Sequence, residues 1–147
     1  MSRIFSIGYA DHSPESLVAA LKEAGVELVV DVRANPVSRK KGFSKRQLDA
    51  ALAEAGIEYR SVRALGIPTA DRAAASGADG WTKLLSDYAS SLDAASDRAE
   101  AAAELADETK LRPTAVMCLE TDLNHCHRKP LSEWIANKTG QELVHLG

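Results

Sequence analysis

The chain has 147 residues, a length that suits one domain in which about 68–70% of the surface of the unfolded chain becomes buried. Its formal net charge of −3 argues against a protein that coats nucleic acid through overall positive charge. Only two cysteines and no apolar run near the ~20 residues of a membrane span argue against a disulfide scaffold and a transmembrane protein. Residues 1–3 lead directly into a short apolar stretch rather than a signal peptide, so we expect a reducing, cytoplasmic location.

The first strand–helix unit has clear boundaries. Apolar residues at 4–7 predict a strand, and Ser13 followed by Pro14 predicts the cap and first turn of a helix. Gly25 stands where a left-handed residue would end that helix. The continuous apolar run at 28–30 then predicts a strand of a parallel sheet that is covered on both faces.

The second unit repeats this pattern. Ser44, with Gln47 three residues later, predicts a capping box at the start of a helix. Gly56 would end the helix before a strand at 57–59. The similar order of signals predicts two successive strand–helix–strand units rather than a repeat protein.

The rest of the chain is less regular. Residues 65–80 are rich in glycine and small polar residues, which predicts either an irregular surface connection or a lid over a site. Helical spacing of apolar residues over 81–109 predicts one long helix or two broken ones. We expect a strand at 114–117, a short helix between Pro130 and Gly140, and a last strand at 143–146.

Alternating strands and helices predict a single α/β domain over residues 1–147, with a mostly parallel, five-stranded, Rossmann-like sheet and helices on both faces. Right-handed crossovers would leave the carboxyl ends of all strands along one edge, where such folds bind ligands. Asp31 and Arg33 follow one predicted strand, and Cys118 and Glu120 follow another. We therefore expect these two segments to meet in one cavity.

The segment from Cys118 to Arg128 contains both cysteines and two of the four histidines. Cys126 would precede a helix amino terminus beside His127 and Arg128, and these surroundings favour a nucleophilic thiolate. The alternative is a small thiol that only packs in a turn. Cys118 is expected to be buried in its strand, so Glu120 is the better candidate for acid–base chemistry.

A basic stretch stands out in this acidic chain. Between Val32 and Leu48 there are six cations and no acid, namely Arg33, Arg39, Lys40, Lys41, Lys45 and Arg46. Together with Arg128 and a helix amino terminus, these residues could form a cradle for a phosphate or a nucleic-acid backbone. The alternatives are a solvated loop and, for Arg33, an ion pair with Asp31.

Cysteine, histidine and carboxylate side chains also ligate zinc, but the spacing here does not favour a zinc site. A structural site would need distant ligands such as His12 or His145, because the chain has no Cys-x-x-Cys pair. Phosphatases and sulfur transferases of the cysteine-loop type need an arginine six positions after the cysteine. Position 132 is Ser132, so we expect neither activity.

Several short motifs resemble one family over nearly the whole chain. They are Ser6-Ile7-Gly8-Tyr9, Asp31-Val32-Arg33-Ala34-Asn35-Pro36 with Ser38-Arg39 and Gly42-Phe43-Ser44, Leu65-Gly66-Ile67-Pro68, Cys118-Leu119-Glu120 and Cys126-His127-Arg128. In combination they resemble the bacterial and archaeal family catalogued as domain of unknown function family 488. The resemblance implies a compact α/β domain and no particular reaction.

We expect an enzyme or a ligand-binding protein whose strand-end pocket holds a phosphate-bearing molecule, either a nucleotide or a nucleic acid. The candidate catalytic residues are Asp31, Glu120, Cys126 and His127, and the candidate ligand contacts are Tyr9, Arg33, Ser38, Arg39, Cys118 and Arg128. A noncatalytic nucleic-acid-binding domain and a metal-stabilised interaction module are the alternatives. The sequence assigns no cofactor, reaction type or oligomeric state.

Overall fold

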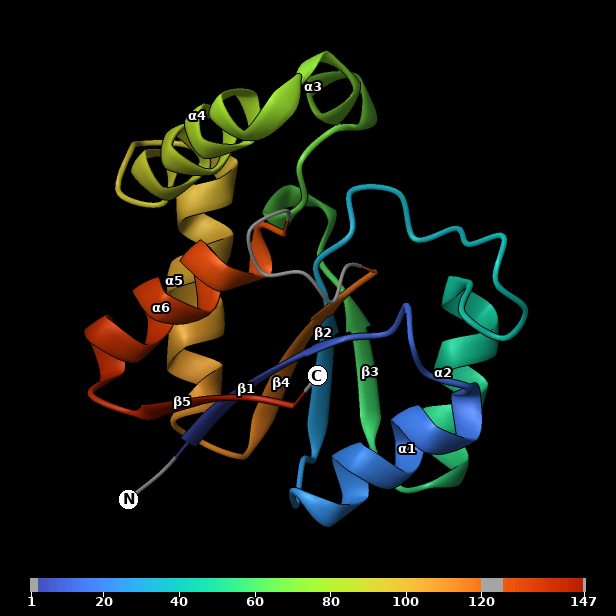
Figure 1. Ribbon diagram of the computed structural model, residues 1–147. Coiled ribbons are helices and arrows are strands. Elements are labelled where there is room, and N and C mark those ends of the chain that lie inside the picture. Colours follow the sequence, from blue (N-terminus) through green and yellow to red (C-terminus); the bar gives the residue numbers. More distant parts are fainter. Residues whose placement is uncertain (1–2, 120–125, 147) are drawn as a thin grey trace.

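The computed structural model describes residues 3–119 and 126–146 and shows an α/β fold. Five parallel strands form one sheet in the order β3-β2-β4-β1-β5, with β4 in the middle and β3 and β5 at the edges (Figure 1). The strands are β1 (Arg3–Gly8), β2 (Leu28–Asp31), β3 (Glu58–Ser61), β4 (Thr114–Cys118) and β5 (Glu142–His145). The predicted Rossmann-like α/β fold is confirmed, and the described sheet is parallel throughout.

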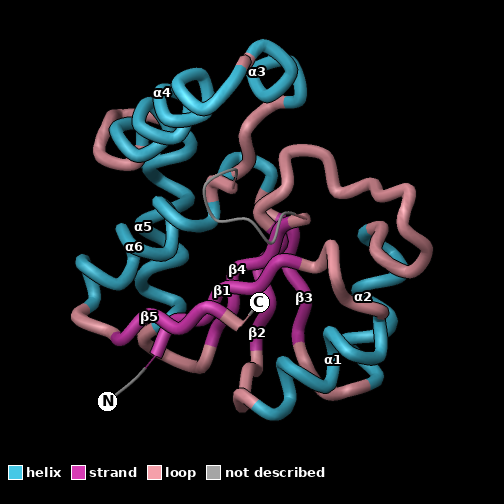
Figure 2. Tube along the Cα trace, in the orientation of Figure 1, coloured by secondary structure: helices cyan, strands magenta, loops and turns pink. Residues whose placement is uncertain are grey.

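Helices cover both faces of the sheet, as predicted. The described helices are α1 (Pro14–Glu23), α2 (Lys45–Glu54), α3 (Thr69–Ala74), α4 (Gly77–Ser91), α5 (Asp97–Thr109) and α6 (Arg128–Thr139), with a short 3-10 helix at Arg63–Leu65. Helices α1 and α2 lie together on one face, whereas α4, α5 and α6 lie together on the other (Figures 1 and 2).

The two faces of the sheet bury two separate apolar cores. On β4, Val116 and Cys118 belong to the core under α4, α5 and α6, whereas Ala115 and Met117 belong to the core under α1 and α2. This alternation follows from the period of two residues in a strand. Because both faces of the central strands are covered, β2 and β4 are apolar almost without interruption.

Local signals set several helix boundaries correctly. Ser13 caps α1 by accepting a hydrogen bond from the backbone N–H of Ser16, and the Ser16 side chain accepts one in return from the Ser13 backbone. Gly140 ends α6 in the left-handed conformation, with φ of 72°, which glycine adopts without steric cost. Both helices therefore end or begin where their capping residues predict.

The predicted capping box at Ser44 is wrong. Ser44 does precede α2, but its hydroxyl accepts a hydrogen bond from the Ser38 backbone N–H rather than from α2. The Gln47 side chain accepts one from the Gly42 backbone N–H. Both side chains thus hold in place the loop between β2 and α2, called the basic loop below, instead of capping the helix.

The segment 65–80 is more regular than predicted. It contains α3 and the first turn of α4, which begins at Gly77 rather than Trp81. The long helical pattern that follows forms two helices. Helix α4 ends at Ser91, and Ser96 caps α5 by accepting a hydrogen bond from the backbone N–H of Ala99. Within the described part of the chain, no helix is long and apolar enough to cross a bilayer.

Candidate functional site

The order of the strands places diverging loops at the carboxyl ends of β1, β2 and β4. The chain leaves β1 and β2 toward α1 and α2 on one face, but it leaves β4 toward α6 on the opposite face. Strand β4 lies between β1 and β2, so loops diverge on both sides of its end. Crevices of this kind hold the ligands of open α/β folds.

A cavity of about 230 Å³ occupies this position. Its polar lining comprises Arg33, Asn35, Arg72 and His127, its apolar and aromatic lining comprises Tyr9, Ala34, Val37, Ile67, Trp81 and Leu119, and Cys118 and Cys126 supply sulfur. The two segments expected to meet, at residues 31–36 and 118–128, both contribute to its wall. Tyr9, Arg33, Cys118, Cys126 and His127 are therefore brought together.

Arg33 is fixed by a buried ion pair with Asp31. The Arg33 guanidinium donates to the Asp31 carboxylate from Nη2 at 2.6 Å and from Nε at 2.9 Å, and both side chains are almost fully buried. Burial opposes the positive charge of Arg33, but the hydrogen bonds and charge of Asp31 outweigh it, so the pKa of Arg33 is raised. Asp31 does not line the cavity, but it holds the guanidinium of the lining residue Arg33 in place.

Two tyrosines complete this cluster. The Tyr9 hydroxyl accepts a hydrogen bond of 3.0 Å from Nη1 of Arg33, and the Tyr9 ring stacks on Phe43 with centroids 4.6 Å apart. Nη1 of Arg33 also donates to the Phe43 carbonyl at 2.8 Å. The Tyr59 hydroxyl donates to Asp31, and burial together with this carboxylate raises the pKa of Tyr59. Most of the hydrogen-bonding capacity of Arg33 is thus directed at the protein itself.

His127 ties the start of α6 to the end of β2. Its Nε2 donates to the backbone carbonyl of Val32 at 2.7 Å, between the ion-paired residues Asp31 and Arg33. Burial is the main cause that lowers the pKa of His127 to about 4, although the bond to Val32 opposes it. His127 is therefore a neutral, structurally engaged imidazole at pH 7, with its Nδ1 as the remaining acceptor.

Cys118 and Cys126 form a disulfide in the structure, which differs from the expectation of two free thiols. Cys118 ends β4 beside the apolar core, and Cys126 lies two residues before α6. The backbone N–H of Arg128 points at Sγ of Cys126 with a distance of 3.5 Å. While the bond is intact, neither sulfur is a thiolate nucleophile.

Of the other predicted site residues, those that the structure describes lie outside this lining. Arg128 is buried and donates to Ser6 on β1 at 3.2 Å, on the face of the sheet that α6 covers. Ser38 is half-buried and holds the basic loop through Ser44 and Lys40, while Arg39 is exposed on that loop. Glu120 lies outside the described residues.

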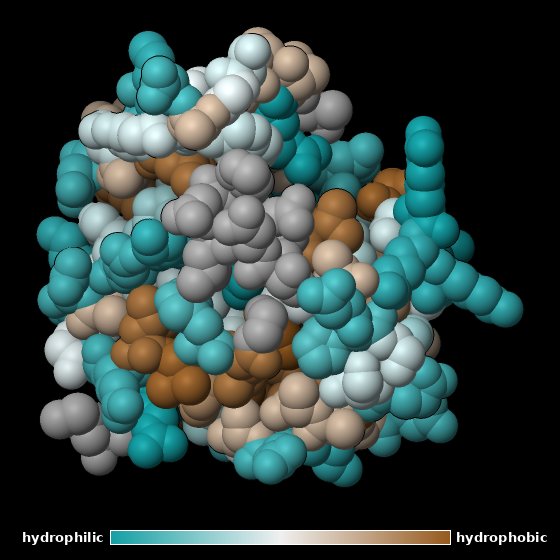
Figure 3. Space-filling view, viewed as in Figure 1, coloured by the Kyte–Doolittle hydropathy of each residue, from teal (hydrophilic) through white to brown (hydrophobic). Residues whose placement is uncertain are grey.

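The basic loop adjoins the cavity. Its first residues, Ala34, Asn35 and Val37, line the cavity, and the cations that follow are exposed. Lys40 donates to the Ala10 carbonyl at 2.9 Å and lies over the Phe43 ring. Hydrophilic side chains project from the molecule in the region of Figure 3 where Figure 1 shows the loop between β2 and α2.

Among the polar and aromatic lining residues, sequence reasoning missed three, namely Asn35, Arg72 and Trp81. Arg72 lies on α3 and Trp81 on α4, both in or beside the stretch that the sequence marks as a connection or lid. The composition of that stretch was the available signal, because long connections near strand ends often carry function. No local pattern, however, distinguishes Arg72 from other exposed arginines.

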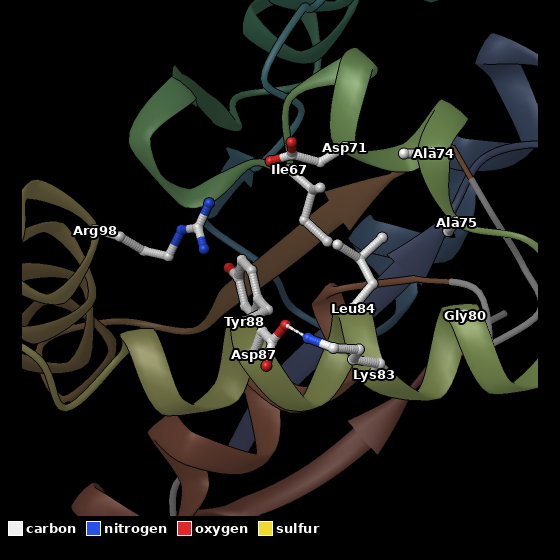
Figure 4. A pocket seen from close by; sticks show the side chains of 10 residues that line it. All are labelled: Ile67, Asp71, Ala74, Ala75, Gly80, Lys83, Leu84, Asp87, Tyr88 and Arg98. Atoms are coloured by element: carbon white, nitrogen blue, oxygen red, sulfur yellow. Dashed lines mark hydrogen bonds and ion pairs between the residues drawn. The ribbon is translucent and has the colours of Figure 1, made fainter.

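A second, larger hollow of about 460 Å³ lies between α3, α4 and α5. In Figure 4, Lys83 pairs with Asp87, and Arg98 reaches toward the Tyr88 ring. Arg98 also donates to the Gly66 carbonyl at 2.9 Å. This hollow shares Ile67 with the strand-end cavity, but its other lining residues lie between Asp71 and Arg98, on and beside α3, α4 and α5. No strand end contributes to it, so we assign the functional site to the smaller cavity.

The described residues do not favour a metal site. Within 3–119 and 126–146, no three histidine, cysteine or acidic side chains are grouped so that they could hold a metal ion. His12 bonds to Ser16 on α1, and His145 bonds to Ser6 on β1, so neither approaches the cysteine pair as a ligand. The described residues thus do not support the metal-stabilised alternative.

Comparison with known proteins leaves the activity open and identifies the family. No curated protein matches the chain, and no solved structure matches it. One family model matches residues 13–135, and its description is Domain of unknown function DUF488. This range contains both segments that form the cavity and most of the resembling motifs. The chain therefore belongs to the DUF488 family.

Proposed function

We propose that the strand-end cavity binds a nucleotide, either as a free nucleoside phosphate or as one unit of a nucleic-acid strand. One observation supports this proposal above all. A single cavity at the switch point of the sheet combines the aromatic rings of Tyr9 and Trp81 with the cations of Arg33 and Arg72. Rings suit a base, and guanidinium groups suit a phosphate.

The size of the cavity limits what it encloses. Pockets that bury a drug-sized ligand usually measure about 300–1,000 Å³. The cavity of about 230 Å³ has room for one base or one phosphorylated group. The rest of the ligand would then extend over the rim, next to the exposed cations of the basic loop.

The charges at the cavity suggest which arginine contacts the phosphate. Asp31 balances the charge of Arg33 and takes up much of its guanidinium, so Arg33 contributes mainly an ordered wall. Arg72 lines the same cavity from α3 and is exposed to solvent. Because a ligand phosphate can reach an exposed guanidinium, we assign the phosphate contact to Arg72 first.

The rim of the cavity is unusually apolar for a surface. Val37 is 68% exposed and Leu119 is 42% exposed, and both line the cavity beside the half-buried Trp81. Exposed apolar groups around a concave polar site are typical of a surface that a ligand covers. A base stacked on Trp81 would cover them.

Tryptophan fluorescence tests this proposal with a control inside the chain. The chain has two tryptophans, and Trp134 lies on α6 with its Nε1 bonded to Asp93 at 3.0 Å, outside the cavity lining. Nucleoside monophosphates should quench the emission of the wild type and of Trp134→Phe, but not that of Trp81→Phe. Quenching that disappears with Trp134 instead would contradict the proposed site.

Removing the charge at Arg72 tests the phosphate contact. Arg72→Gln should weaken binding by roughly tenfold or more, since a charge-assisted hydrogen bond contributes about 1.5–3 kcal/mol. The control is Arg3→Gln, because Arg3 is also exposed but lies at the amino end of β1, away from the carboxyl ends that form the cavity. Equal affinity of the two variants would exclude Arg72 as the phosphate anchor.

We propose further that the site is catalytic, with the reaction type open. Cys126 would be the nucleophile when its disulfide is reduced, Glu120 would transfer protons, and Asp31 and His127 would position Arg33 and Val32. Replacing Cys126 or Glu120 with alanine should abolish turnover of a substrate without abolishing binding.

We also propose the cytoplasm as the location, as the sequence predicts.

The exposed basic loop favours a second candidate function, a noncatalytic nucleic-acid-binding domain. Arg39 and Lys41 on this loop are exposed, as are Lys45 and Arg46 at the start of α2, which has no acid in its first turn. Cations at a helix amino end oppose the helix dipole, so local stability does not explain them. In this case affinity for an oligonucleotide should fall steeply with salt, while mononucleotides should not bind.

A further inference from the structure

The disulfide joins two elements that other contacts already hold in place. Cys118 ends the central strand β4, whose end is paired to β1 through a 3.1 Å hydrogen bond from the Tyr9 N–H to the Cys118 carbonyl. Cys126 precedes α6, which His127 anchors to Val32. The two cysteines are only eight residues apart, so the bond closes a short loop and restricts the unfolded chain less than a long one would.

The location of the disulfide is unusual for a structural cross-link. Both cysteines line the strand-end cavity together with Arg33 and Arg72. A small molecule that enters the cavity therefore contacts both residues, although Cys118 is only 3% exposed and Cys126 only 2%. Disulfides in reducing compartments are mostly transient and catalytic or sensory, and a cytoplasmic location is the one that we propose for this chain.

The two sulfur atoms have different surroundings. Sγ of Cys126 faces the backbone N–H of Arg128 at the amino end of α6, a helix of 12 residues. A helix amino end and nearby guanidinium groups stabilise a thiolate. Cys118 lies at the end of a strand, whose backbone has only a small net dipole. Cys126 is therefore the better leaving group of the pair.

We propose that Cys118 and Cys126 form a redox-active dithiol pair that undergoes thiol–disulfide exchange with a low-molecular-weight thiol inside the strand-end cavity. The thiolate of the small thiol attacks Sγ of Cys118, the bond between the two protein sulfurs breaks, and its electron pair leaves with Cys126. A second small thiolate attacks the external sulfur of the mixed disulfide and releases Cys118. Two small thiols are oxidised to their disulfide, and the protein gains two electrons and two protons.

This exchange would control the chemistry of the site. In the oxidised protein the cavity has no thiolate, whereas reduction places the Cys126 sulfur at its wall beside Arg33 and Arg72. This effect on the site rests on the proposed function, because a nucleophile at the cavity wall matters only if a ligand binds in the cavity. The exchange itself requires no nucleotide and is tested without one.

The test is a redox titration of the purified, folded protein. Samples are equilibrated with a range of dithiothreitol to oxidised dithiothreitol ratios, quenched in acid, alkylated in denaturant and weighed as intact chains. We expect only species with no adduct or two adducts, which interconvert in one two-electron transition, and circular dichroism that stays native at both ends. Two adducts at every ratio would overturn the proposal, and so would reduction that occurs only after the protein is unfolded in urea.

Single-cysteine variants test the proposed asymmetry. The thiol of Cys126 in Cys118→Ser should react with iodoacetamide at pH 7 at least about threefold faster than that of Cys118 in Cys126→Ser, with a lower midpoint in its pH profile. If either serine variant fails to fold, the matching alanine variant replaces it. Equal rates, or a faster Cys118, would contradict the assignment of the leaving group. Because thiol counts involve no nucleotide, failure of the proposed function leaves these results unaffected.

Discussion

The buried pair of Asp31 and Arg33 makes the most specific energetic prediction. In Arg33→Met the Asp31 carboxylate stays at 0% exposure but loses the donors at Nη2 and Nε of Arg33. Removing one partner of a buried ion pair usually costs about 3–5 kcal/mol, because the other charge is left without compensation. We expect the free energy of unfolding of Arg33→Met to fall by this amount, and Asp31→Asn to give a loss of similar size.

A double-mutant cycle separates the pair from its surroundings. Urea unfolding followed by circular dichroism gives the free energy for the wild type, both single variants and Asp31→Asn/Arg33→Met. We expect the double variant to lose at least about 2 kcal/mol less than the sum of the single losses, since contacting charges couple. Tyr59→Phe, which removes one hydrogen bond to the same carboxylate, should cost only about 1.5–3 kcal/mol. Additive losses in the cycle would refute the argument that Arg33 is held mainly by Asp31.

Three further predictions concern the surroundings of the cavity and a buried hydrogen bond at the end of α5. The pKa of His127 is lowered from 6.5 to about 4, so the folded state binds fewer protons than the unfolded state between these values. Neutral His127 therefore adds up to about 3 kcal/mol to the free energy of unfolding above pH 6.5, and this stabilisation is lost as the pH falls toward 4. An NMR titration that finds His127 protonated near pH 6.5 would contradict this prediction. In Gly66→Ala the new Cβ would lie 2.1 Å from the Ala34 backbone nitrogen, so we expect a loss of about 1–3 kcal/mol in urea unfolding, against a change within about 1 kcal/mol for the control Gly80→Ala. Thr109→Val removes the buried hydroxyl that bonds to the Ala106 carbonyl and to Gln141, and thermal unfolding should show a loss of about 1–3 kcal/mol, whereas an unchanged midpoint would mean that this bond contributes nothing.

Features of the fold that depend on local sequence were predictable. Gly25 and Gly140 end helices because each adopts a positive φ, and the apolar runs of β2 and β4 reflect burial on both faces. The failure of the predicted capping box at Ser44 could not be foreseen, because the partner of its hydroxyl, Ser38, is set by the path of the basic loop. A local sequence signal predicts structure poorly where a tertiary contact competes for the same hydrogen-bonding group.

The candidate site was predictable only in outline. Parallel strands put Arg33 and Cys126 at one edge of the sheet, so their shared cavity follows from topology. Arg72 and Trp81 reach that cavity through the packing of α3 and α4, which no sequence pattern in those helices reveals. The engagement of Arg33 by Asp31 and the placement of Arg128 against Ser6 likewise depend on side-chain directions that only the folded chain defines.

The proposal that the strand-end cavity is the ligand site is tested most directly by NMR mapping. Backbone amide shifts of the ¹⁵N-labelled protein are followed as a nucleoside monophosphate is added at physiological salt. We predict that the largest changes cluster at Tyr9, Asn35, Arg72 and Trp81, around the ends of β1, β2 and β4. Changes that cluster at Lys83 and Asp87 in the other hollow, or no saturable change at all, would contradict the account.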